Sequence, residues 1–123
     1  MTKYTEYKFR PIKVREDLEG LYGPVSDLIH FAKKEKLHDF IKLADQLFPG
    51  LSDETLLAAY NFFCEAEPRL EGDELLTEPV RMSGLLDLLP FLGCIAQPGS
   101  LVTVEADGHP FLERVVREDG SLD

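Results

Sequence analysis

The amino-acid sequence changes character over residues 97–117, which read QPGSLVTVEADGHPFLERVVR. Residues 101–106 contain the β-branched side chains typical of a strand, and Asp107-Gly108 supplies a turn directly after them. We therefore predict a hairpin in which 101–106 pairs with 111–117. The apolar positions of the second run also have helical spacing, so a helix that begins at Pro110 is the alternative.

Upstream of this hairpin, apolar residues recur mainly at helical spacing. Residues 25–48 carry two apolar faces, and the change of face at Lys33-Lys34-Glu35-Lys36 predicts two short helices or one bent helix. Ser52 is suited to cap the next helix, which we expect to run to about Ala66. Phe62 lies off the apolar face of that helix, as a second core contact or as an exposed contact residue. The buried face is predicted to hold Leu56, Leu57, Tyr60, Phe63 and Cys64.

Further elements are predicted on both sides of these helices. The spacing of Val14, Leu18, Leu21 and Tyr22 predicts a short helix, and aromatic residues at positions 4, 7 and 9 predict an edge strand that ends at Pro11. A last helix is expected between Thr77 and Pro90, and residues 91–96 are a candidate third strand. The inner side of that helix would be formed by Val80, Met82, Leu85, Leu86 and Leu89.

Length and composition indicate how these elements combine. The 123 residues predict one domain, and a hydrophobic content of 44% is enough for one ordinary core. We predict an α+β fold with four to five short helices packed together, followed by a small C-terminal antiparallel sheet. Residues 1–123 are expected to form a single compact domain, with a basic N-terminal arm or edge strand at 1–11.

The sequence also predicts a compartment. The N-terminal residues contain no apolar run of the kind found in signal peptides. The longest apolar stretch, 84–96, is interrupted by Asp87 and Pro90 and is too short to span a bilayer. We therefore expect a cytoplasmic protein that does not contact a membrane, in which Cys64 and Cys94 are buried free thiols.

Charge is distributed unevenly along the chain, whose net charge is −10. Residues 1–48 contain nine Lys and Arg against eight Asp and Glu, whereas residues 49–123 contain four against fifteen. Six of these acidic residues fall in the window 65–78, which we predict to be a loop with Gly72-Asp73 at its centre. Such a field repels nucleic-acid phosphates and attracts basic protein surfaces.

No motif for catalysis or metal binding stands out. Asp27 and His30 could face one metal ion from a helix, but a site needs three or four ligands. The acidic window lacks the spacing of a calcium loop, and the chain lacks a nucleophile elbow and a phosphate-binding loop. We therefore expect no catalytic residues, no metal, no cofactor and no enzymatic activity. An unrecognised pair of carboxylates would instead make the protein a small enzyme.

These properties predict a non-enzymatic protein that binds and inhibits a basic protein partner. An immunity protein that neutralises a toxin or nuclease has this chemistry, as does an inhibitor of another nucleic-acid enzyme, and direct binding of nucleic acid is not expected. A self-associating structural or regulatory adaptor, in which a homodimer is left open, is the alternative. The predicted binding residues are Glu65, Glu67, Glu71, Asp73, Glu74 and Glu78, with Phe62 as an apolar anchor.

Overall fold

The computed structural model describes residues 5–20 and 22–123. Lys3 and Tyr4 of the predicted arm, and Leu21 of the first predicted helix, lie outside the described residues. The α+β class is confirmed, because the described residues form four helices and two antiparallel sheets. The elements are β1 (Glu6–Phe9), β2 (Ile12–Lys13), α1 (Pro24–Lys33), α2 (Leu37–Leu47), α3 (Asp53–Glu65), β3 (Arg69–Glu71), β4 (Glu74–Leu76), β5 (Val80–Arg81), α4 (Leu85–Ile95), β6 (Leu101–Ala106) and β7 (His109–Val115).

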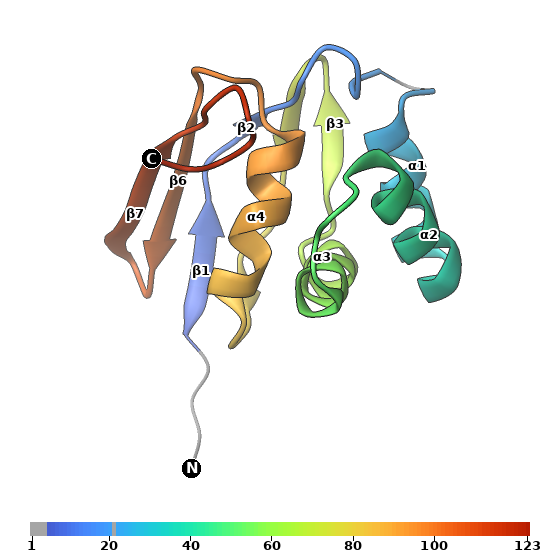
Figure 1. Cartoon of the computed structure of the whole chain (residues 1–123). Coiled ribbons are helices and arrows are strands. Elements are labelled where there is room, and N and C mark those ends of the chain that lie inside the picture. The colour runs from blue at the N-terminus through green and yellow to red at the C-terminus, as the bar shows by residue number, and fades with distance from the viewer. Residues whose placement is uncertain (1–4, 21) are drawn as a thin grey trace.

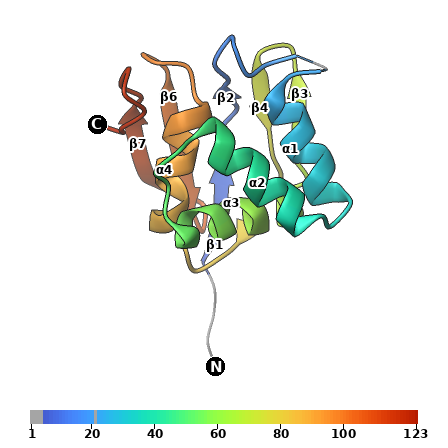
Figure 2. The ribbon, with the colours of Figure 1, turned by 45° about the vertical axis from the view of Figure 1, so that its right-hand side comes forward.

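The two sheets adjoin at the N-terminal segment. The larger sheet has the order β5-β1-β6-β7, and the smaller has the order β2-β4-β3. Figures 1 and 2 show the helices together on one side of the strands. The prediction of a purely C-terminal sheet is wrong, because strands from the N-terminal part of the chain also take part. The prediction of an edge strand within 1–11 is also wrong, because β1 lies inside the larger sheet. Tyr7 aligns with Val80 of β5 on one side and with Ala106 of β6 on the other. The buried side chain of Phe9 explains this inner position, since it belongs to the core face of the sheet.

The predicted C-terminal hairpin is confirmed, and the helical alternative from Pro110 is wrong. β6 pairs with β7 in a register that aligns Leu101 with Val115. Asp107 and Gly108 both have positive φ, 50° and 83°, as a two-residue type I′ turn requires. The Asp107 carboxylate also accepts a hydrogen bond of 3.0 Å from the Glu6 N–H. This turn is therefore fixed to the start of β1.

The predicted break between the first two helices is confirmed, and it lies at residues 34–36. Glu35 adopts a φ of 56°, and its N–H donates to the carbonyl of Ala32. The Lys36 N–H donates to the carbonyl of Phe31. This pair of hydrogen bonds is the Schellman arrangement that ends a helix with a left-handed residue. The chain then turns into α2, whose Phe40 is fully buried.

The start of α3 follows the prediction, but its buried face does not. Ser52 Oγ accepts a hydrogen bond of 3.1 Å from the Thr55 N–H, as an N-cap does. Leu57 and Cys64, predicted to be buried, are exposed. Phe62 is buried instead, because its ring packs edge-on against Phe9 of β1 at 4.9 Å. The strand that sets this face lies more than fifty residues earlier in the chain, so the helix pattern alone does not reveal it.

The last predicted helix begins later than expected and continues through Pro90. Val80 and Arg81 form β5, and α4 extends to Ile95, so the candidate strand at 91–96 is wrong. A proline inside a helix costs about 3 kcal/mol. Phe91, Leu92 and Ile95 are each fully buried, and burial of such side chains contributes about 1.5–3 kcal/mol apiece. Burial after the proline therefore outweighs the cost of continuing the helix.

The helix predicted between Val14 and Tyr22 is absent from the described residues of that segment. The Val14 N–H donates to the carbonyl of Asp73 at 2.7 Å, and the Arg15 N–H donates to the carbonyl of Ile95 at 2.9 Å. Only a single turn follows, in which the Arg15 carbonyl accepts hydrogen bonds from the N–H groups of Leu18 and Glu19 at 2.9 and 3.1 Å, and Gly20, with a φ of 97°, comes directly after it. No helix within residues 5–20 and 22–123 is long and apolar enough to cross a membrane.

Candidate partner-binding surface

The predicted acidic loop is a hairpin formed by β3 and β4. Gly72-Asp73 is its turn, as predicted, and Gly72 has the φ of 63° that suits the first position of a type II′ turn. Leu70 and Leu75 are opposite each other in the register, and both pack against the core. Because side chains alternate along a strand, their neighbours Glu71 and Glu74 point to the opposite face. Both glutamates are exposed there.

Glu71 and Glu74, here called the tip pair, are direct cross-strand partners. Side chains in such positions have Cβ atoms about 4.5–5.5 Å apart, and like charges placed there are destabilising. Neither glutamate forms a salt bridge with another residue in the part of the chain that the structure describes. The tip of the hairpin therefore holds two adjacent negative charges without a paired cation.

The segment that directly follows the predicted arm pairs with this hairpin, whereas β1, the described strand of the arm, belongs to the larger sheet. β2 pairs with β4, so that Lys13 lies across from Glu74. Its ammonium group, however, is 3.8 Å from the carboxylate of Asp73. Both partners are about half exposed, so this ion pair is worth no more than about 1 kcal/mol. Lys13 compensates Asp73 and leaves the tip pair without an ion pair of its own.

The other three predicted acidic residues lie at the base of the hairpin, near the end of α3. The Glu78 N–H donates to the carbonyl of Ala66 at 2.7 Å, which ties the chain after β4 to the end of the helix. The carboxylate of Glu78 lies 3.6 Å from the guanidinium of Arg69. Glu65 and Glu67 are exposed and have no salt bridge within the described residues. The six predicted residues thus form two groups, one at the tip and one at the base.

Phe62 takes the first of its two predicted roles, that of a core contact. Its side chain is 1% exposed and offers no free apolar anchor to a partner. The exposed apolar residue of α3 is Leu57, at 47% exposure. It lies on a stripe with Glu54, Asn61 and Glu65, spaced by three or four residues as one helix face requires. The prediction that Leu57 is buried is therefore wrong, although its spacing with these polar residues is apparent in the sequence.

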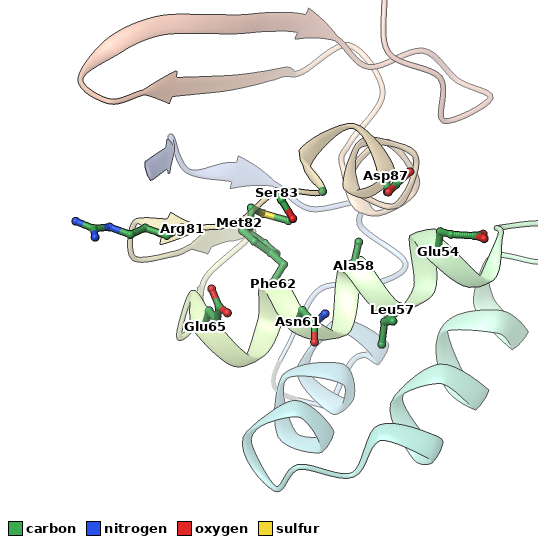
Figure 3. Close-up of a pocket in the computed structure, with 11 residues that line it drawn as sticks. Glu54, Leu57, Ala58, Asn61, Phe62, Glu65, Arg81, Met82, Ser83 and Asp87 are labelled. Atoms are coloured by element: carbon green, nitrogen blue, oxygen red, sulfur yellow. The ribbon is translucent and has the colours of Figure 1, made fainter. Parts of the chain in front are cut away.

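The stripe forms one wall of a groove of about 450 Å³. The other wall is formed by the end of β5 and the residues that connect it to α4, from Arg81 to Gly84, together with Asp87 of α4. Figure 3 shows Glu54 and Glu65 toward opposite ends of the α3 wall, with Asp87 across from it on α4. Arg81 points away at one end, and its guanidinium lies 3.6 Å from the Glu6 carboxylate. Three carboxylates therefore surround a floor that includes Ala58, Phe62 and Met82.

The two cysteines lie in different environments. Cys94 is half-buried, and burial raises the pKa of its thiol, although Arg15 opposes that shift. The Cys64 thiol donates to the carbonyl of Ala32 at 3.7 Å, and its hydrogen bond with the Tyr60 phenol raises the pKa of that phenol. In the described residues no three His, Cys, Asp or Glu side chains are placed to hold a metal ion.

Three comparisons with known proteins found no relative. No family model, no curated protein and no solved structure matches the chain. The arrangement of side chains on the hairpin and in the groove is therefore the basis for a functional assignment.

Proposed function

We propose that this protein binds a basic protein partner through its acidic hairpin and inhibits that partner. The observation that carries the proposal is the tip pair, in which Glu71 and Glu74 face each other across β3 and β4. A lysine or arginine placed between them by a partner would relieve their repulsion and form charge-assisted hydrogen bonds. Charge-assisted contacts that lose water at an interface contribute far more than exposed pairs do.

Inhibition follows from the kind of partner that this charge selects. Proteins that bind nucleic acid present lysine and arginine to phosphate groups. Carboxylates at the tip would occupy the same cations and exclude the phosphates. An immunity protein that neutralises a toxin or nuclease, or an inhibitor of another nucleic-acid enzyme, is the class that this mechanism suits.

Self-association, the alternative function, would most readily use β7, because it is the longer of the two edge strands of the larger sheet. Three features weaken that edge as a template. Pro110 has no N–H to donate. The pairing of β7 with β6 is interrupted by a bulge, at the step from Val104 to Glu105 of β6. Val115 already exchanges two hydrogen bonds with Asp123, at 3.1 and 2.9 Å. Such features are typical of edges that do not recruit a further strand, which favours the inhibitor.

The test is a pull-down with the tagged protein from lysate of its own cells, followed by measurement of affinity for the captured protein. We expect a basic partner whose affinity falls as salt is raised. The double variant Glu71→Lys with Glu74→Lys should bind it at least about tenfold more weakly at low salt, because a repulsive contact replaces an attractive one.

The matched control is Asp45→Lys with Glu113→Lys, which changes the net charge equally at exposed positions on α2 and β7. It should keep most of the affinity if the tip pair forms the contact. Equal losses in both double variants would show that only net charge matters, and would refute the assignment of the surface.

A further inference from the structure

We infer that the groove between α3 and the β5–α4 segment is a second contact site, which takes an extended basic segment of the same protein partner. This inference rests on the proposed function, because it assumes a basic protein partner. It extends the proposed partner-binding surface from the hairpin to residues outside the acidic window 65–78. Glu54, Leu57 and Asp87 line this groove and lie on α3 and α4, outside the hairpin.

The shape of the groove limits what can occupy it. Glu54 and Glu65 are eleven residues apart on α3, which corresponds to about 16 Å at 1.5 Å per residue. An extended peptide covers that distance in about five residues. Because side chains alternate along an extended segment, arginines at its first and fifth positions point to the same face about 13 Å apart, and their long side chains reach the rest of the way to the two glutamates. An apolar residue between them would lie against the half-exposed side chain of Leu57.

Charge decides between a basic segment and a second copy of this chain. Glu54, Glu65 and Asp87 have no salt bridge within the described residues. The single cation that lines the groove, Arg81, is paired with Glu6 at 3.6 Å. A second copy would bring a further net charge of −10 toward these carboxylates. The groove is therefore complementary to a basic partner, and its carboxylates repel the net negative charge of a second copy of this chain.

The test uses a defined probe, the capped peptide Arg-Ala-Leu-Ala-Arg, titrated into the full-length ¹⁵N-labelled protein at about 20 mM NaCl. We expect saturable chemical-shift changes at amides of residues 54–65 and 81–87. A peptide with glutamate in place of both arginines should cause none. Shifts confined to the β3–β4 hairpin, or no saturable shifts up to about 5 mM peptide, would overturn the inference.

Variants with matched controls locate the contact. Glu54→Lys should weaken peptide binding about fivefold or more, because it reverses one end of the groove. Asp53→Lys is the control, since it makes the same charge change in the same first turn of α3 without lining the groove. Leu57→Ser should also weaken binding, whereas Leu86→Ser, at an even more exposed leucine outside the groove lining, should not. Equal effects within either pair would overturn the inference.

The two proposals fail in different ways. If the peptide binds in the groove but no basic partner is captured, the proposed function is wrong and the groove still recognises basic segments. If a partner is captured through the tip pair but the peptide does not shift the groove, only the second contact site is wrong.

Discussion

Glu67 occupies a backbone conformation that favours glycine. Its φ is 46°, and it follows the last turn of α3. A non-glycine residue in the left-handed region costs about 1–2 kcal/mol relative to right-handed backbone, and the Cβ of Glu67 is the source of that cost. A glutamate in this position is thus unfavourable for stability and adds a charge at the base of the hairpin.

Glu67→Gly should therefore raise the free energy of unfolding by up to about 1 kcal/mol, after the greater flexibility of glycine in the unfolded chain is subtracted. Urea denaturation would measure the change. Glu65→Gly is the control, because Glu65 is the last residue of α3, where the lower helix propensity of glycine should destabilise by up to about 0.5 kcal/mol. Destabilisation by both substitutions would contradict the strain at Glu67.

Among the helices, α4 contains a residue that disfavours helical structure. Pro90 lies inside α4 and cannot donate the hydrogen bond that the carbonyl of Leu86 would accept. Leu86 is 75% exposed, so its side of the helix faces solvent, where water can satisfy that carbonyl. The helix persists because the residues after the proline are buried.

Pro90→Ala should restore this hydrogen bond and raise the free energy of unfolding by about 1–2 kcal/mol, seen as a higher thermal midpoint. Pro79→Ala serves as the comparison, because Pro79 is exposed and lies outside the helices and strands. It should shift stability by less than about 0.5 kcal/mol. A loss of stability in Pro90→Ala would mean that the proline is itself needed for the path of α4.

The sequence predicted those helix ends and turns that depend on residues close together in the chain. The α1–α2 break, the Ser52 cap and the Asp107-Gly108 turn each depend on a few neighbouring residues. The strands of the acidic hairpin were missed because three-residue strands leave almost no pattern, and their partner β2 lies some sixty residues earlier in the chain. The position of β1 inside its sheet and the burial of Phe62 likewise depend on distant partners.

The candidate surface also combines features that the sequence shows directly with features that depend on distant residues. The excess of acidic residues could be read from composition alone, but the opposition of Glu71 and Glu74 requires the hairpin register. The groove requires α3 and α4 to be placed side by side, so Asp87 could not be connected with Glu54 from the sequence.

For the whole molecule, a net charge of −10 on 123 residues means that the folded state repels itself. Five salt bridges among the described residues oppose this repulsion. All five lie between partly or largely exposed side chains, where each contributes little. We therefore expect the general repulsion to exceed the attraction of these pairs.

Stability should accordingly rise, by about 0.5–1 kcal/mol, when NaCl is raised from about 20 to about 300 mM. The urea midpoint at the two salt concentrations measures this change. A variant with Glu65, Glu71 and Glu74 replaced by glutamine should show a smaller rise, because it has less repulsion to screen. A fall in stability with salt would show that the ion pairs dominate instead.

The inner position of β1 has a consequence for how the protein is made. β1 leaves the ribosome before its neighbours, because β5 begins at Val80 and β6 at Leu101. At about 5–20 residues per second, the first strand waits several seconds for the two strands that enclose it. During that interval its edges are open, and the nascent chain depends on its helices for any early structure. β1 can be enclosed on both sides only when translation has passed residue 106, so a stall before that point would release a chain in which one edge of β1 is unpaired and the core is exposed.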